Sequence, residues 1–139
     1  MDYAKVSEYE NVSVEFHDSD VASVELRDSD LIITLSPAVV HRSPGIPGVD
    51  PGTCWSQDAV LLLPGGLIQG ARPWLPSTLS EGTITAGDQS YENVIPVCSD
   101  LVGRVNLRLT FVNGDQLGVD AQGLKVVLMG SARFIGTFD

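Results

Sequence analysis

Residues 104–128 read RVNLRLTFVNGDQLGVDAQGLKVVL, and this stretch decides the fold. Apolar side chains occupy every second position on both sides of Asn113-Gly114: Val105, Leu107, Leu109, Phe111, Leu117, Val119 and Ala121. Alternation with period two is typical of a β-strand that buries one face. Asn-Gly suits the two positive-φ positions of a tight hairpin turn. The stretch therefore predicts an antiparallel hairpin, followed at Gln122-Gly123 by a second turn and by another strand over residues 124–128.

The same alternation recurs upstream of the hairpin. We expect further strands at residues 12–16, 21–27, 31–35, 55–63, 67–72, 82–85 and 91–97. Short turns such as Asp28-Ser29-Asp30 separate them, and only residues 4–10 could form a short helical turn. About nine or ten short strands with almost no helix predict an all-β fold. We expect a single domain over residues 1–139, built as a meandering antiparallel barrel or a strongly bent sandwich.

Two interruptions in the strand pattern concern the segment around His41. Pro37 cannot donate to a β-ladder, so it is expected at a bulge or at an edge. A bulge would change the side toward which His41 points, which leaves its orientation open. The sequence SPGIPGVDPGT over residues 43–53 then predicts a turn-rich loop, and long ordered loops are often functional.

Length and composition place the chain among globular proteins. A length of 139 residues is typical of one domain, and no apolar run approaches the ~20 residues of a membrane span. The first residues lack a basic region followed by an apolar one, so we expect no secretory signal and a cytoplasmic location. Cys54 and Cys98 have no metal-type spacing, and we expect reduced thiols rather than a disulfide.

Acidic residues are concentrated near the start of the chain. Of a net charge of −10, residues 1–30 carry −7, because only Lys5 and Arg27 oppose nine acids: Asp2, Glu8, Glu10, Glu15, Asp18, Asp20, Glu25, Asp28 and Asp30. This distribution argues against nucleic-acid binding, which requires clustered cations. An acidic surface can attract a basic partner. The alternative is that it only keeps the protein soluble.

Polar residues gather at the ends of two predicted strands. The candidate binding residues are His17, Asp18, Asp20, His41, Arg42, Ser43 and Trp55. If the strand ends meet, a carboxylate can fix an imidazole tautomer and Arg42 can bind an anion. In the structural alternative, Asp18 caps a turn, His17 is a surface residue and Arg42 pairs with an acid on a loop, or the group anchors the loop that follows Ser43. Trp55 and Trp74 are expected to cover one end of the fold.

Other kinds of chemistry have weaker sequence support. A metal site would need three or four converging ligands, and neither cysteine has the spacing, so we predict no metal and no cofactor. Ser19 and Ser43 lie near a histidine in the sequence and Cys54 follows the loop, but the chain has no G-x-S-x-G elbow. We therefore assign no catalytic residue and expect that the protein is not an enzyme.

The string FHDSDV at residues 16–21, followed by a predicted hairpin, resembles a group of small bacterial all-β domains of unknown function. These domains carry an HDS or HDA motif at the end of an early strand. The downstream SPAVVHRS and the segment around Trp55 look similar to the same group. Some domains with an HDA-type opening are classed as immunity proteins of polymorphic toxin systems; this chain has Ser19 where they tend to have alanine.

Three hypotheses follow for the function. The leading one is a non-enzymatic binding module of the bacterial cytoplasm, which the resemblance narrows to an immunity-type antagonist of a basic protein. The second is a small-molecule-binding or enzymatic β-barrel with a site around His17, Asp18, His41 and Arg42. The third is an assembly role, in which an uncovered apolar face pairs with a second copy of the chain. No membrane partner is expected.

Overall fold

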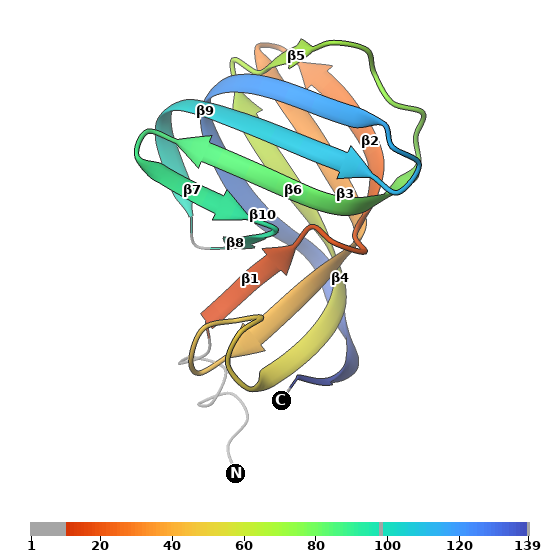
Figure 1. The fold of residues 1–139 in the computed structure, drawn as a ribbon, viewed down its shortest axis with the longest axis vertical. Helices are drawn as coiled ribbons and strands as arrows, with labels where there is room; N and C mark the ends of the chain where they lie inside the picture. The colour runs from red at the N-terminus through yellow and green to blue at the C-terminus, as the bar shows by residue number, and fades with distance from the viewer. Residues whose placement is uncertain (1–10, 98, 139) are drawn as a thin grey trace.

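The computed structural model describes residues 11–97 and 99–138, and Figure 1 shows their fold. These residues form ten β-strands: β1 (Asn11–Glu15), β2 (Asp20–Arg27), β3 (Asp30–Ser43), β4 (Gly52–Pro64), β5 (Leu67–Gln69), β6 (Ser77–Ala86), β7 (Gln89–Glu92), β8 (Val94–Pro96), β9 (Asp100–Phe111) and β10 (Gln116–Phe138). The described ranges contain no helix, and hence none long and apolar enough to cross a membrane. The predicted all-β fold is confirmed; the short turn expected at residues 4–10 lies outside the described residues.

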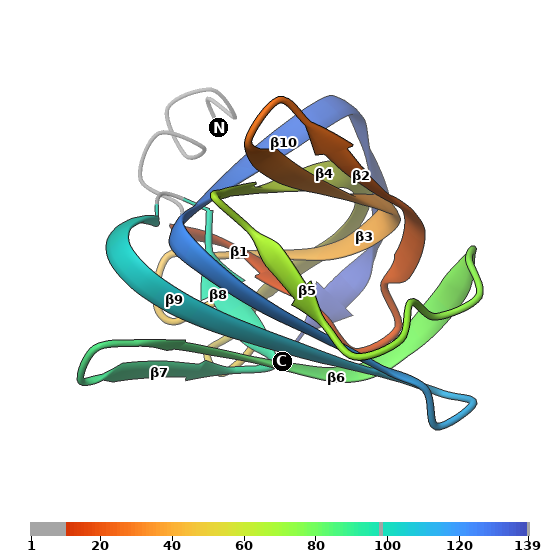
Figure 2. The same ribbon diagram turned by 90° about the horizontal axis from the view of Figure 1, so that it is seen from above.

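All ten strands belong to one antiparallel sheet. Its main path runs β2-β6-β9-β10-β4-β3-β1-β8, and an additional pairing joins β2 to β3. The pairings therefore close a ring of six strands, which Figure 2 shows from above. The ring is uneven, because β2 meets β6 through only two residue pairs, Asp20 with Thr78 and Val21 with Ser77. Within the described structure, residues 22–27 of β2 are paired on the β3 side only.

The core lies inside the ring. Its members include the alternating apolar residues of the predicted hairpin, from Val105 to Phe111 on β9 and from Leu117 to Ala121 on β10. Phe16 is fully buried, and its ring packs against the backbone of β6 at Gly82. A Cβ added to Gly82 would lie 2.6 Å from the Phe16 ring, so this close approach requires glycine.

The hairpin is present, but its turn differs from the prediction. Only Gly114 of the Asn113-Gly114 pair has a positive φ, of 94°. Residues 112–115 form the connection, in which Phe111 donates its N–H to the carbonyl of Asp115 and Gly114 donates to that of Phe111. The wider connection replaces a two-residue turn, so only one left-handed residue is needed.

The second predicted turn, at Gln122-Gly123, was wrong: β10 continues through it as a strand of 23 residues. A register shift lies there, because β9 has one residue more than β10 between the pairs Val105–Ala121 and Val102–Gly123. Across this shift, the buried apolar positions of β10 change from odd numbers, up to Ala121, to the even-numbered Leu124 and Val126. In the sequence, this change in the alternation of apolar residues looks the same as a turn, although the strand does not end there.

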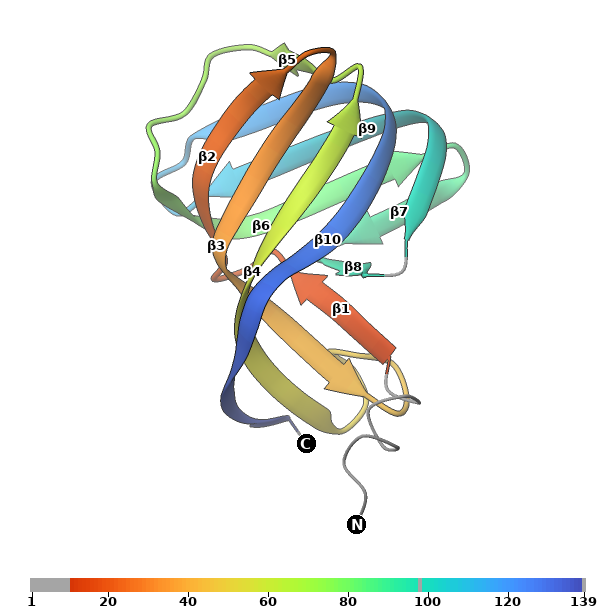
Figure 3. The same cartoon turned by 180° about the vertical axis from the view of Figure 1, so that it is seen from behind.

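The far ends of three strands leave the ring and form a twisted extension, which we call the arm. It consists of β1, residues 38–43 of β3, 52–57 of β4 and 133–138 of β10. Figure 3 shows β3, β4 and β10 running from the ring into it. The β3–β4 register shifts between Leu35 and Ala38, which confirms the bulge expected at Pro37, and β10 has a shift between Met129 and Arg133.

Candidate functional site

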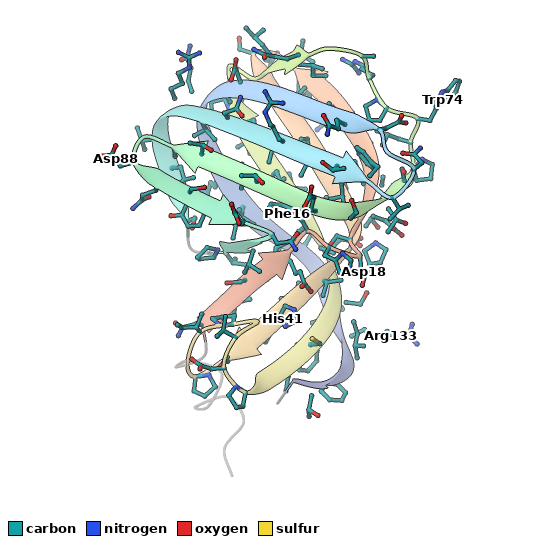
Figure 4. The ribbon with its side chains drawn as sticks, in the orientation of Figure 1. Phe16, Asp18, His41, Trp74, Asp88 and Arg133 are labelled. Atoms are coloured by element: carbon teal, nitrogen blue, oxygen red, sulfur yellow. The ribbon has the colours of Figure 1, made fainter. Side chains whose placement is uncertain are left out.

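His41 lies in the arm, between an acid and a thiol. Its Nε2 is 2.9 Å from Oε2 of Glu15, and its Nδ1 is 3.2 Å from Sγ of Cys54. Figure 4 shows His41 inside the arm, where its side chain is 6% exposed. Cys54 is half-buried and is a free thiol. The imidazole thus contacts both the carboxylate of Glu15 and the thiol of Cys54.

Strand register brings these three side chains to one face of the arm. Ser13 of β1 pairs with His41 of β3, His41 pairs with Cys54 of β4, and Cys54 pairs with Gly136 of β10. Directly paired residues share a face, and so do residues two apart on one strand. Glu15 is two residues after Ser13, so its side chain reaches the same face.

The carboxylate sets the tautomer of the imidazole. An ionised Glu15 can only accept hydrogen bonds, so Nε2 of His41 carries the proton and donates it. Sγ of Cys54 is 3.2 Å from Nδ1 and 3.9 Å from Nε2, so the sulfur lies over the face of the ring and not in line with the Nδ1 lone pair. The carboxylate therefore orients the imidazole, and the thiol packs against the ring.

Burial raises the pKa of the Cys54 thiol, and the negative charge of Glu15 raises that pKa further. The thiol is therefore protonated at neutral pH. In the ranges 11–97 and 99–138, no three His, Cys, Asp or Glu side chains could hold a metal ion.

The Pro/Gly loop between β3 and β4 lies beside this cluster. Ser43 donates from its hydroxyl to the carbonyl of Pro51 and accepts from the N–H of Gly45. Gly48 has a φ of 83°, and a Cβ added to it would be 3.9 Å from Cδ2 of His41. Ser43 thus anchors the loop, and the loop packs near the imidazole.

His17 has different partners from His41. It is exposed, its Nδ1 donates to the carbonyl of Ser80 at 2.8 Å, and its Nε2 is 3.5 Å from Asp18. The Ser80 carbonyl raises the pKa of His17 most, and the charge of Asp18 raises it further. Among the interactions seen here, none joins the two imidazoles.

The other candidate residues make separate contacts. Arg42 follows His41 directly and so points to the opposite face, where its guanidinium lies 5.1 Å from the centre of the Trp55 ring. Trp55 also packs edge-on against Phe134, at 5.3 Å between ring centres. Asp20 accepts a hydrogen bond from the Thr78 hydroxyl. The seven predicted residues are therefore divided among several small contacts.

Sequence reasoning missed two members of the cluster. As a functional residue, Glu15 was considered only as one of the acids of residues 1–30, and Cys54 only as a weakly supported nucleophile after the loop. The available signal was the loop itself, because treating residues 44–51 as a long hairpin connection would have paired His41 with Cys54. Trp74 does not cover the fold as expected, since it is 87% exposed.

A hollow of about 620 Å³ lies elsewhere, between residues 69–73 and the outer side of β9. Its charged lining mixes both signs, with Arg72 and Arg108 beside Glu81 and Asp115, and it contains no histidine or cysteine. The arm cluster has the more specific chemistry, although it lies outside this hollow.

Comparison with known proteins adds no relative. No protein-family model, no curated protein and no solved structure matches the chain. The resemblance to immunity-type domains therefore stays a prediction.

Proposed function

We propose that this protein is a non-enzymatic binding module that recognises a basic protein partner. In its most specific form it is an immunity-type antagonist that covers the active site of a basic toxin. The observation that carries the proposal is an array of carboxylates on β2, on its two flanking turns and at the start of β3, which we call the acidic edge: Asp18, Asp20, Glu25, Asp28 and Asp30.

Positively charged residues of the chain itself neutralise the acidic edge only weakly. In the described part of the chain, three ion pairs occur: His17–Asp18, Arg27–Glu25 and His41–Glu15. The first two lie on the surface, and pairs of this kind contribute about 1 kcal/mol or less. A basic protein surface would supply the missing positive charge, which increases the association rate and orients the partner.

The geometry of β2 also supports a protein partner. Residues 22–27 have a paired neighbour on one side only, so part of the strand edge is open. Leu26, between Glu25 and Arg27, is 60% exposed. An apolar side chain within a charged surface is typical of protein interfaces, whose buried centre is less charged than the rim.

The test is affinity capture followed by binding measurements. The bait is the parent protein or the triple variant Asp18→Asn, Glu25→Gln, Asp28→Asn. Asparagine tolerates the positive φ of positions 18 and 28, which is 70° and 54°. The matched control neutralises three other exposed acids, Asp88, Glu92 and Asp100. Figure 4 shows Asp18 and Asp88 on opposite sides of the molecule.

We expect the parent and the control to retain a basic protein that the acidic-edge variant loses. For that purified partner, the Kd should be at least ~10-fold higher with the acidic-edge variant than with the parent. For the parent, the Kd should rise by a similar factor when the salt concentration is raised from about 0.05 M to about 0.5 M. Equal affinity of the two triple variants for the partner, or binding that does not depend on salt, would contradict the proposal.

A further inference from the structure

The hollow beside β9 has no part in the acidic-edge proposal, yet its lining contains both signs of charge. We propose that this hollow, which we call the β9 hollow, is a binding site for a free α-amino acid in its zwitterionic form. The guanidinium of Arg108 binds the carboxylate of the ligand, and the carboxylate of Glu81 binds its ammonium group. This inference goes beyond the binding function and does not depend on it.

The β9 hollow has the size and the construction of a small-molecule site. Its volume of about 620 Å³ lies within the roughly 300–1,000 Å³ of most ligand sites. The loop over residues 69–73 and the hairpin end over residues 114–117 line its sides. Asp120 accepts hydrogen bonds from Gln69 and from Asn106, which ties the start of the loop to the sheet. The floor is the outer face of the sheet, at Glu81, Thr83, Asn106, Arg108, Thr110 and Gly118.

Gly118 leaves room in this floor, although neither its backbone nor its packing requires glycine. It lies in the interior of β10, paired with Arg108 on β9 and with Gln69 on β5. Its φ is not positive, and an added Cβ would lie 3.6 Å from the Gln69 carbonyl oxygen, which is an ordinary contact. Glycine weakens a strand interior and often marks a place where a ligand approaches the backbone closely. The missing side chain therefore points to a ligand beside Arg108.

Arg108 and Glu81 carry opposite charges that do not neutralise each other. Thr83 pairs with Arg108 and Glu81 pairs with Thr110, so the two charged residues are diagonal neighbours, about 7–8 Å apart along the backbone face. Among residues 11–97 and 99–138, neither of them has a hydrogen-bond or ion-pair partner. Both charges are therefore available, and they are near enough for one small molecule to contact both.

The two signs of charge select a zwitterion. A ligand with only negative charge would meet Glu81 and Asp115 in the same hollow, and a ligand with only positive charge would meet Arg72 and Arg108. An α-amino acid has its carboxylate and its ammonium group on one carbon, so it satisfies both signs at once. The guanidinium donates paired hydrogen bonds to the carboxylate, and the ammonium group donates to the carboxylate of Glu81.

The remaining floor selects a polar side chain on the ligand. The hydroxyls of Thr83 and Thr110 line the hollow, and within the described ranges they bond to no other residue. A hydroxyl both donates and accepts hydrogen bonds. We therefore expect amino acids with hydroxyl or amide side chains to bind more tightly than those with aliphatic ones.

The test is an NMR titration of the isotope-labelled full chain with the standard amino acids, one at a time, up to about 10 mM. We expect at least one with a hydroxyl or amide side chain to bind with a Kd of about 1 mM or lower. Its binding should shift the amide signals of residues 81–83 and 114–118. Absence of binding by every amino acid at about 10 mM would overturn the proposal.

Two derivatives of the amino acid that binds test the zwitterion itself. The N-acetyl derivative lacks the ammonium group and the primary amide lacks the carboxylate, so each should bind at least ~10-fold more weakly. If either derivative bound as tightly as the amino acid, the hollow would be a simple anion site or a simple cation site, and the proposal would be wrong.

Variants of the chain test the assigned residues. Arg108→Gln and Glu81→Gln should each raise the Kd at least ~10-fold. Arg104→Gln, on the same strand but outside the hollow, and the exposed Asp88→Asn are the matched controls and should keep the Kd within about twofold of the parent. Gly118→Leu fills the floor and should abolish binding. Unchanged affinity of Arg108→Gln or Glu81→Gln, whose parent side chains are exposed, overturns the proposal even if Gly118→Leu failed to fold.

Discussion

At the scale of single residues, the two histidines of the chain show that the surroundings of a side chain decide which contacts it makes. His17 is exposed and bridges a turn to β6 through the Ser80 carbonyl, whereas His41 is buried between Glu15 and Cys54. Their flanking sequences, His17-Asp18 and His41-Arg42, suggested the reverse, because His17 has the adjacent carboxylate. The carboxylate that orders an imidazole comes to His41 from a neighbouring strand instead.

His17 yields a pH prediction at this scale. The Ser80 carbonyl and Asp18 raise its folded pKa above the unfolded value of 6.5, so protonated His17 stabilises the fold. That contribution is complete below the unfolded pKa and is lost as pH rises through the folded pKa. The difference in unfolding free energy between the parent and His17→Gln should therefore shrink from acidic to alkaline pH. Urea unfolding across this window checks it, and a difference that grows with pH would contradict it.

At the scale of elements, the hairpin of β9 and β10 shows what alternation can and cannot predict. The inward-facing residues up to Ala121 were correctly identified, because a half-buried strand alternates locally. The end of the strand was not, because a bulge and a turn both interrupt the alternation. The neighbours decide between them: β4 pairs with β10 beyond this point, so the strand continues.

The bulge itself gives a prediction for this element. Gly103 lies in it with a φ of 98°, and a Cβ there would touch nothing within 4 Å. Gly103→Ala should therefore lower the unfolding free energy by about 1–2 kcal/mol, through backbone strain rather than through a clash. Gly136→Ala is the matched control, since it has equal space and no positive φ. Equal stability of the two variants by urea unfolding would show that no strain arises at Gly103.

At the scale of the whole molecule, the ring has one weak closure. The seam between β2 and β6 has two residue pairs, whereas β4 is paired along its length with β3 and β10. The same open edge lies beside the carboxylates of the proposed binding surface. Proteins often place interaction sites where local stability is low, because rearrangement costs little there.

Hydrogen exchange tests the seam. Within residues 22–27, the alternate amides that do not point toward β3 should exchange at least ~10-fold faster than amides of residues 59–63 in β4. Addition of a basic partner at the acidic edge should slow exchange in residues 22–27. Equal protection of the two strands in the free protein would mean that the ring is closed more firmly than its pairings indicate.

The amino-acid sequence by itself determined the strand content, the buried faces of β9 and β10, the bulge at Pro37 and the acidic character of the early segment. These properties depend on residues near one another in the chain, where side-chain period and backbone chemistry act directly. Only the tertiary structure decided that Glu15, His41 and Cys54 meet. Their contact depends on the register among β1, β3 and β4, which the bulge and the loop over residues 44–51 set together. A shift of one residue would turn His41 to the other face, and no local pattern specifies that choice.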